Sequence, residues 1–202
     1  MSYNPNDLPS FEPKLIVFTA PSGAGKTTIV RHLLKSYDFL GFSISATNRE
    51  KREKETDGKD YYFLSTEEFN QKVENGDFIE WEEVYDNQYY GTLKSEVTRN
   101  WDNNKYVVFD IEVKGATNIK KLYGDKAFVV FIRPPSLETL INRLTNRNTE
   151  SPSSLRKRIN RVKQEMTYEQ SFDYVLVNDV LDVSLKEAEV ITESFILGKL
   201  SS

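Results

Sequence analysis

A lysine and a threonine at the end of a glycine-rich turn carry the clearest chemistry in this chain. Lys26 and Thr27 follow the turn at 20–25, which lies between an apolar segment at 14–19 and a helix-forming segment at 29–34. Glycines let several backbone N–H groups point into one concavity, and the start of a helix adds positive potential. This order of strand, turn, Lys-Thr and helix is typical of a phosphate-binding P-loop. It predicts a nucleoside triphosphate site, with Lys26 on the outer phosphates and Thr27 on Mg²⁺.

The first position of the turn departs from the usual pattern, because Ala20 stands where P-loops have glycine. A methyl group is tolerated there if the backbone keeps a negative φ, which we expect for Ala20. The alternative interpretation is a glycine-rich turn that binds nothing. The predicted phosphate-binding residues are Ala20, Pro21, Ser22, Gly23, Ala24, Gly25, Lys26, Thr27 and Thr28.

Composition narrows the classes of protein to which the chain can belong. Its 202 residues are 38% hydrophobic and 29% charged, which is typical of a globular domain. The absence of cysteine excludes a disulfide scaffold and thiolate chemistry. The net charge of −4 does not favour nucleic acid as a partner, and no apolar run has transmembrane length. The first 13 residues lack the order of a signal peptide, so we expect a cytoplasmic protein with no membrane partner.

Short apolar segments alternate with helical patterns along the chain. Strands are expected at 15–20, 42–45, 106–111, 128–132 and 174–177, and helices at 26–36, 114–123, 136–147, 153–170 and 183–197. Strands rich in Val, Ile and Phe suit a parallel sheet with helices on both faces, so the alternation predicts an α/β fold. The block at 61–100 interrupts this alternation, and its helix opens with the capping box Ser65-x-x-Glu68. It predicts an inserted lobe with short strands of its own.

Five further segments follow the P-loop in an order that carries a family resemblance. They span 42–52, 57–63, 78–81, 89–92 and 109–116. Together with the P-loop they resemble guanylate kinases closely, from about residue 14 to the C-terminal helix. The resemblance implies a single domain over 1–202 with a P-loop-type parallel core, a GMP-binding lobe of mixed short strands and a helical lid. The implied core covers about 14–44, 104–135 and 171–197, the lobe about 45–100 and the lid about 136–168.

The activity implied by this resemblance is transfer of the γ-phosphate of Mg-ATP to GMP, and also to dGMP. In-line transfer without a covalent intermediate is expected, because we find no nucleophile with an adjacent base. ATP and GMP are the expected partners, and Mg²⁺ is the expected metal. The sequence leaves the oligomeric state open, including a homo-oligomer.

The resemblance also implies which residues bind GMP. Arg49 and Arg52 would clamp its phosphate, since guanidinium forks bind phosphate oxygens bidentately. Glu80 suits guanine, because a carboxylate accepts hydrogen bonds from both N1–H and N2–H₂. Glu112 stands where the family usually has aspartate, and its alternative role is to cap the helix that follows. The implied GMP-binding residues are Ser45, Arg49, Arg52, Tyr61, Glu80, Tyr90, Thr92 and Glu112.

A further set of residues would serve the transfer itself. The implied catalytic residues are Lys26, Arg49, Arg147, Arg158 and Asp110, with Asp110 near Mg²⁺ through water. Convergent cations stabilise the charge that develops on the migrating phosphoryl group. Asn178 matches the family segment beside adenine. We expect the remaining lid arginines, Arg143, Arg156 and Arg161, to be solvated.

Two other functions fit parts of this pattern. Guanylate-kinase-like domains of scaffold proteins bind phosphopeptides without catalysis, but such domains lack the P-loop lysine that this chain has at position 26. A P-loop kinase for another nucleotide, or a GTPase, is the second alternative. A GTPase would need an Asn-Lys-x-Asp segment to read guanine, and the sequence contains none.

Overall fold

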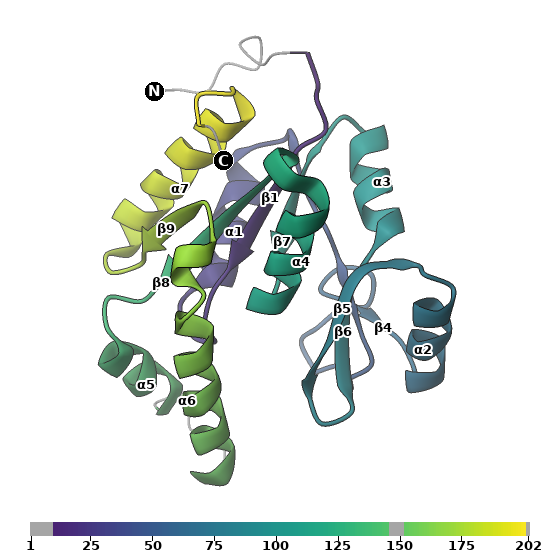
Figure 1. The fold of residues 1–202 in the computed structure, drawn as a ribbon, viewed down its shortest axis with the longest axis vertical. Coiled ribbons are helices and arrows are strands. Elements are labelled where there is room, and N and C mark those ends of the chain that lie inside the picture. The colour runs from purple at the N-terminus through teal and green to yellow at the C-terminus, as the bar shows by residue number, and fades with distance from the viewer. Residues whose placement is uncertain (1–9, 146–151, 201–202) are drawn as a thin grey trace.

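Two β-sheets organise the chain, for which a computed structural model describes residues 10–145 and 152–200, without the side chains of 143–144 and 152–158 (Figure 1). The larger sheet is parallel, with the strand order β2-β7-β1-β8-β9. Its strands are β1 (Leu15–Thr19), β2 (Leu40–Phe42), β7 (Tyr106–Asp110), β8 (Ala127–Arg133) and β9 (Tyr174–Val177).

Strand β1 shows why this sheet is covered on both faces. Its residues are all buried, and successive side chains point to opposite sides of a strand. Ile16 and Phe18 pack in one apolar cluster with residues of two helices, α1 (Lys26–Ser36) and α7 (Leu181–Ile196). Leu15 and Val17 pack in the other cluster, which includes residues of α3 (Lys94–Asp102) and α4 (Val113–Tyr123). The expected α/β fold with a helix-flanked parallel sheet is therefore confirmed.

The smaller sheet is mixed and has the order β4-β3-β6-β5. Its elements are β3 (Ser45–Thr47), β4 (Tyr62–Phe63), β5 (Phe78–Tyr85), β6 (Gln88–Leu93) and the helix α2 (Thr66–Glu74). Phe69 of α2 packs on Ala46, Phe78 and Leu93, which gives this sheet an apolar core of its own. The predicted capping box is present, since Ser65 and Glu68 exchange hydrogen bonds at the start of α2.

The expected strand at 42–45 is wrong, because the chain changes sheets within it. Strand β2 ends at Phe42 and β3 begins at Ser45. Between them, the N–H of Ser43 donates to the carbonyl of Val108, whereas the N–H of Ile44 donates to the carboxylate of Glu96. The apolar run therefore continues through a change of hydrogen-bond partners that its residue types do not reveal.

Two parts of the chain project from the same end of the parallel core (Figure 1). One is the smaller sheet with α2, and the other contains α5 (Leu137–Thr145) and α6 (Pro152–Met166). Helix α6 is shorter than expected, and a 3₁₀ turn at Glu169–Ser171 follows it; a second such turn lies at Gly124–Lys126. The division into core, GMP-binding lobe and lid stays a prediction. None of the described helices is long and apolar enough to cross a membrane.

Candidate nucleotide-binding site

The turn between β1 and α1 has the backbone geometry of a phosphate-binding loop. Gly23 and Gly25 have φ angles of 92° and 96°, which glycine adopts readily and other residues rarely do. Ala20 is buried, and it is not among the described non-glycine residues with positive φ. The condition under which alanine is tolerated at this position is therefore met. Helix α1 begins at Lys26, so its first N–H groups lie at the end of the turn.

Lys26 and Thr27 meet the end of strand β7. The Lys26 ammonium lies 2.8 Å from Asp110 Oδ1 and donates to the carbonyl of Ile111 at 2.7 Å. Burial alone would lower the pKa of Lys26, but the negative charges of Asp110 and Glu112 outweigh it and raise the pKa. Lys26 is therefore a cation held at the mouth of the turn.

Asp110 also accepts a hydrogen bond from the hydroxyl of Thr27, the residue after Lys26. Thr27 Oγ1 donates to Asp110 Oδ2 at 2.8 Å. A threonine hydroxyl and a carboxylate are hard oxygen donors of the kind that Mg²⁺ prefers. The donor chemistry of the pair thus fits the Mg²⁺ that the sequence predicts, with Thr27 as ligand and Asp110 near the ion through water.

Asn178, which follows strand β9, contacts the backbone of the turn. Its side-chain amide is buried and donates to the carbonyl of Ala24 at 2.7 Å, while its backbone N–H donates to Arg133. A Cβ atom at Gly25 would collide with this amide, so the close approach requires glycine. Asn178 supports the turn in this structure; its predicted place beside adenine stays a prediction.

One face of the smaller sheet collects polar side chains that are far apart in the sequence. Thr92 of β6 lies opposite both Ser45 of β3 and Glu80 of β5, and all three are buried. Tyr90, two residues before Thr92, points to the same face because the side-chain period of a strand is two. The opposite face carries Ala46 and the other apolar residues that pack on α2.

Glu80 is the buried acid of this face. Thr92 Oγ1 donates to its Oε1 at 2.6 Å, and burial raises the pKa of Glu80 to about 7, against the opposing effect of that hydrogen bond. Gly115 of α4 makes room for the carboxylate, since a Cβ atom there would lie 2.6 Å from Glu80 Oε2. A buried acceptor of this kind suits a ligand that presents N–H donors.

The guanidinium of Arg49 is fixed by contacts with four side chains. Its two terminal nitrogens bind the carboxylate of Glu55 at 2.6 and 2.7 Å, and its Nε donates to the Tyr90 hydroxyl at 3.1 Å. The guanidinium also lies over the rings of Tyr61 and Phe63, at 5.0 and 5.5 Å from their centroids. The hydrogen bonds from Arg49 hold the pKa of Glu55 near 2. Arg49 is therefore pre-positioned and charged.

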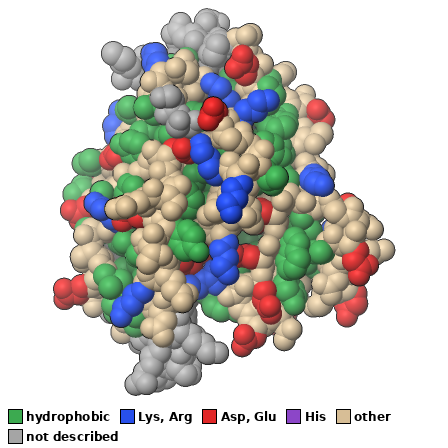
Figure 2. Space-filling model, viewed as in Figure 1, with side chains coloured by type: hydrophobic (Ala, Val, Ile, Leu, Met, Phe, Trp, Pro, Cys, Tyr) green, Lys and Arg blue, Asp and Glu red, His purple; other side chains and the backbone are tan. Residues whose placement is uncertain are grey.

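The P-loop and the polar face of the smaller sheet lie close enough to affect each other. Burial is the main cause of the raised pKa of Tyr61, and the charges of Asp110 and Lys26 act on it next, in opposite directions. Figure 2 shows basic and acidic side chains together in the region between the two projecting parts. The structure thus brings Tyr61, Tyr90 and Arg49 together near the end of the P-loop that carries Lys26.

Other predicted residues are placed less tightly. The side chain of Arg52 is exposed, and its backbone N–H donates to Glu55. Glu112 occupies the N-cap position of α4 without a side-chain cap hydrogen bond, so the capping alternative is not observed. Thr28 is exposed at the start of α1. Two predicted cations, Arg147 and the side chain of Arg158, lie outside the described residues.

Two residues of this region were missed by the sequence analysis. Glu55 was not among the predicted site residues, although its carboxylate binds both terminal nitrogens of Arg49. Arg161 was expected to be solvated, and this expectation is wrong, because its side chain is only 24% exposed and ion-paired. The spacing of Arg161 and Glu165, one turn apart on a helix, was the available signal for part of this arrangement.

Comparisons with known proteins agree with this geometry. Residues 12–194 match the family model described as guanylate kinase. A guanylate kinase of Bacteroides thetaiotaomicron is 49% identical over 89% of this chain and 89% of its own length. One of Salinibacter ruber is 50% identical over 86% of this chain and 92% of its own. This chain belongs to the guanylate kinase family.

A solved structure supports the same assignment at the level of the fold. The crystal structure of guanylate kinase from Anaplasma phagocytophilum has a TM-score of 0.72 to this chain at 25% identity. The match covers 92% of this chain and 87% of the other. The resemblance to guanylate kinases drawn from the sequence motifs is therefore confirmed.

Proposed function

We propose that this member of the guanylate kinase family transfers the γ-phosphate of ATP to GMP, giving ADP and GDP. The observation that carries the proposal is the meeting of a P-loop, with Lys26 on Asp110, and a buried acidic face built around Glu80 and Thr92. The first element suits a triphosphate, and the second suits the adjacent N–H donors of guanine.

On the donor side, the backbone of the turn and Lys26 bind the phosphates of ATP. Lys26 leaves the carboxylate of Asp110 for the outer phosphate oxygens, which are the stronger anionic partner. Thr27, together with Asp110 through water, would hold Mg²⁺, and the ion would supply positive charge to the phosphates. Asn178 supports the turn, because its side-chain amide donates a hydrogen bond to the carbonyl of Ala24.

On the acceptor side, Glu80 accepts hydrogen bonds from guanine, while Ser45 and Thr92 contribute hydroxyl groups and Glu112 a second carboxylate. Arg49, Arg52, Tyr61 and Tyr90 bind the phosphate of GMP and align its oxygen with the γ-phosphorus. These contacts involve the base and the phosphate, so dGMP serves as an acceptor too. Arg147 and Arg158 belong to the proposed catalytic set by their positions in the sequence.

Catalysis then consists of positioning and charge stabilisation. The acceptor oxygen is already anionic, so no general base is required, and the transfer proceeds in line without a covalent intermediate. The one histidine, His32, lies between α1 and α7 with its Nε2 2.8 Å from the carboxylate oxygen Oε1 of Glu189, and it takes no part in this scheme.

A coupled assay of ADP formation, with GMP, dGMP, AMP, CMP or UMP offered in turn, tests this function. We expect turnover with GMP and dGMP, and AMP to be poorer by about 10⁴-fold, because a site built to hydrogen-bond its substrate rejects analogues lacking the donors. A reaction without any acceptor measures background ATP hydrolysis. Equal kcat/KM values for GMP and AMP would reject the proposed guanine site.

A further inference from the structure

Arg161 of α6 connects three elements that lie far apart in the sequence. Its Nη1 donates to the carbonyl of Val84 at 2.5 Å, and its Nη2 lies 3.2 Å from Glu82 Oε1, both on β5. The same Nη2 lies 3.5 Å from Glu112 Oε2, just before α4. Its Nε donates to Glu165 Oε1 at 2.7 Å, within α6 itself. One guanidinium thus joins both projecting parts to the core.

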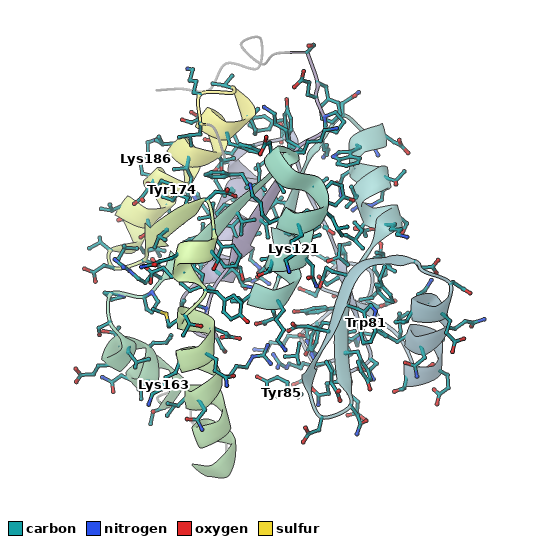
Figure 3. All side chains as sticks on the ribbon, viewed as in Figure 1. Trp81, Tyr85, Lys121, Lys163, Tyr174 and Lys186 are labelled. Atoms are coloured by element: carbon teal, nitrogen blue, oxygen red, sulfur yellow. The ribbon has the colours of Figure 1, made fainter. Side chains whose placement is uncertain are left out.

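The tip of β5 also covers this guanidinium. Its central carbon lies 5.5 Å from the centroid of the Tyr85 ring, which is the geometry of a cation–π contact. Figure 3 shows Tyr85 at the edge of the β5–β6 hairpin nearest to α6. Arg161 is therefore enclosed between the hairpin and the helix rather than extended into solvent.

The surroundings of Arg161 are strongly acidic. Glu82, Glu112 and Glu165 face it from three elements, and one carboxylate oxygen of Glu82 and one of Glu165 are buried without a hydrogen-bond partner. Burial raises the pKa of both of these acids, the charge of Glu112 adds to that rise, and Arg161 opposes it. Without the guanidinium, three carboxylates would repel each other across this contact.

We propose that Arg161 is a positioning residue that clasps α6 to the β5–β6 hairpin and to the start of α4. It would hold the two projecting parts in the arrangement in which the polar face around Glu80 approaches the P-loop. The consequence for GMP rests on the proposed function: apparent affinity falls in proportion to the fraction of molecules in the binding-competent arrangement.

Steady-state kinetics of Arg161→Gln provide the first test. We expect the KM for GMP to rise about tenfold, because the loss of one hydrogen bond to a charged group typically changes an equilibrium by at least that factor. The KM for ATP should change less than twofold. Lys163→Gln is the matched control, because Lys163 is an exposed cation on the same helix and makes none of these contacts. Arg161→Lys should lie between, because an ammonium keeps the charge but lacks the fork.

A distance measurement tests the clasp without any activity. The chain has no cysteine, so cysteines placed at the exposed positions Gln88 and Gln164 would carry the only two spin labels. We expect Arg161→Gln to broaden and lengthen the distance distribution between the labels, and Lys163→Gln to leave it unchanged. Circular dichroism would verify that α6 stays helical in each variant.

Glu82→Gln removes the partner of Arg161 on β5. It therefore tests the same contact without changing α6, so that a local defect in α6 can be distinguished from loss of the contact. The double variant with Arg161→Gln should be no worse than the more affected single variant, because the two side chains act through one contact. An unchanged label distance in Arg161→Gln, or fully additive effects, would overturn the clasp. Failure of the wild-type protein to use GMP would instead overturn the proposed function and leave the distance result standing.

Discussion

The P-loop and the polar face of the smaller sheet would both bind a nucleotide, yet they are built in different ways. The P-loop is one continuous turn whose geometry comes from backbone, with Gly23 and Gly25 at positive φ. The polar face is assembled from single side chains on three strands, with Ser45 and Glu80 on either side of Thr92. A binding site made of consecutive backbone groups can be recognised locally, whereas one made of side chains depends on strand register.

The backbone forms the P-loop, but its lysine supplies the charge that acts on the transferring phosphate, so we expect the largest effect of a single substitution there. Lys26→Ala should lower kcat by about 10²–10³, the usual loss when one preorganised electrostatic contact to a transition state is removed. Lys35→Ala, an exposed lysine on the same helix, is the control. The coupled assay measures both variants. More than half of wild-type turnover in Lys26→Ala would show that the lysine does not act on the transferring phosphate.

The next largest effect should come from the buried acid of the polar face. Glu80→Ala removes the acceptor for guanine N–H groups and should lower kcat/KM for GMP by about 10- to 100-fold, with much less change for AMP. Glu83→Ala on the same strand is the control, because Glu83 is exposed. The measurement is the ratio of kcat/KM for GMP to that for AMP. If the ratio stays at its wild-type value, Glu80 does not read the base.

A smaller effect is expected for an arginine that the structure leaves exposed. Arg52→Ala should raise the KM for GMP about tenfold with little change in kcat, because a phosphate contact present in both ground and transition states affects binding alone. Lys51→Ala, its exposed neighbour, controls for the loss of one positive charge. Equal KM values for the two variants would exclude a specific role for Arg52.

The smallest expected effect concerns pH. Burial raises the pKa of Glu80 to about 7, so the carboxylate that guanine needs is lost as the pH falls through that value. Between pH 8 and pH 7, kcat/KM for GMP should fall roughly twofold, because a carboxyl group with this pKa is mostly ionised at pH 8 and about half protonated at pH 7. The phosphate of GMP titrates nearby, near pH 6. The control is Glu80→Gln, for which the phosphate of GMP still titrates but residue 80 does not. If the pH profiles of kcat/KM are identical for this variant and the wild type, titration of Glu80 does not affect GMP binding.

The sequence predicted the core of the fold well because its signals there are local. The helix at 26–36 was predicted with its observed bounds, and the capping box at Ser65 was recognised from two residues three apart. The strand at 42–45 was misjudged, because Ser43 and Ile44 are apolar or small and nothing in their types shows that their N–H groups bind different partners.

The candidate site was predicted in its residues but not in their connections. Family motifs named Arg49, yet the role of Glu55 as its carboxylate partner depends on a turn of the loop that brings position 55 back to position 49. Arg161 was misread for a similar reason. Its helix face looks solvated in the sequence, and only the placement of the β5–β6 hairpin against α6 encloses it.

The change of sheets at Ser43 and Ile44 has a mechanical consequence. These two residues are all that separates β2 from β3, and on the return path β6 ends at Leu93 while α3 begins at Lys94. Two extended residues span at most about 7 Å, so the smaller sheet cannot slide away from the core. The movement that these short connections allow is a rotation of the smaller sheet about a hinge formed by the two connections. In such a rotation the tip of the β5–β6 hairpin, which is farthest from the hinge, would be displaced most. Arg161 binds the hairpin near this tip, through the carbonyl of Val84.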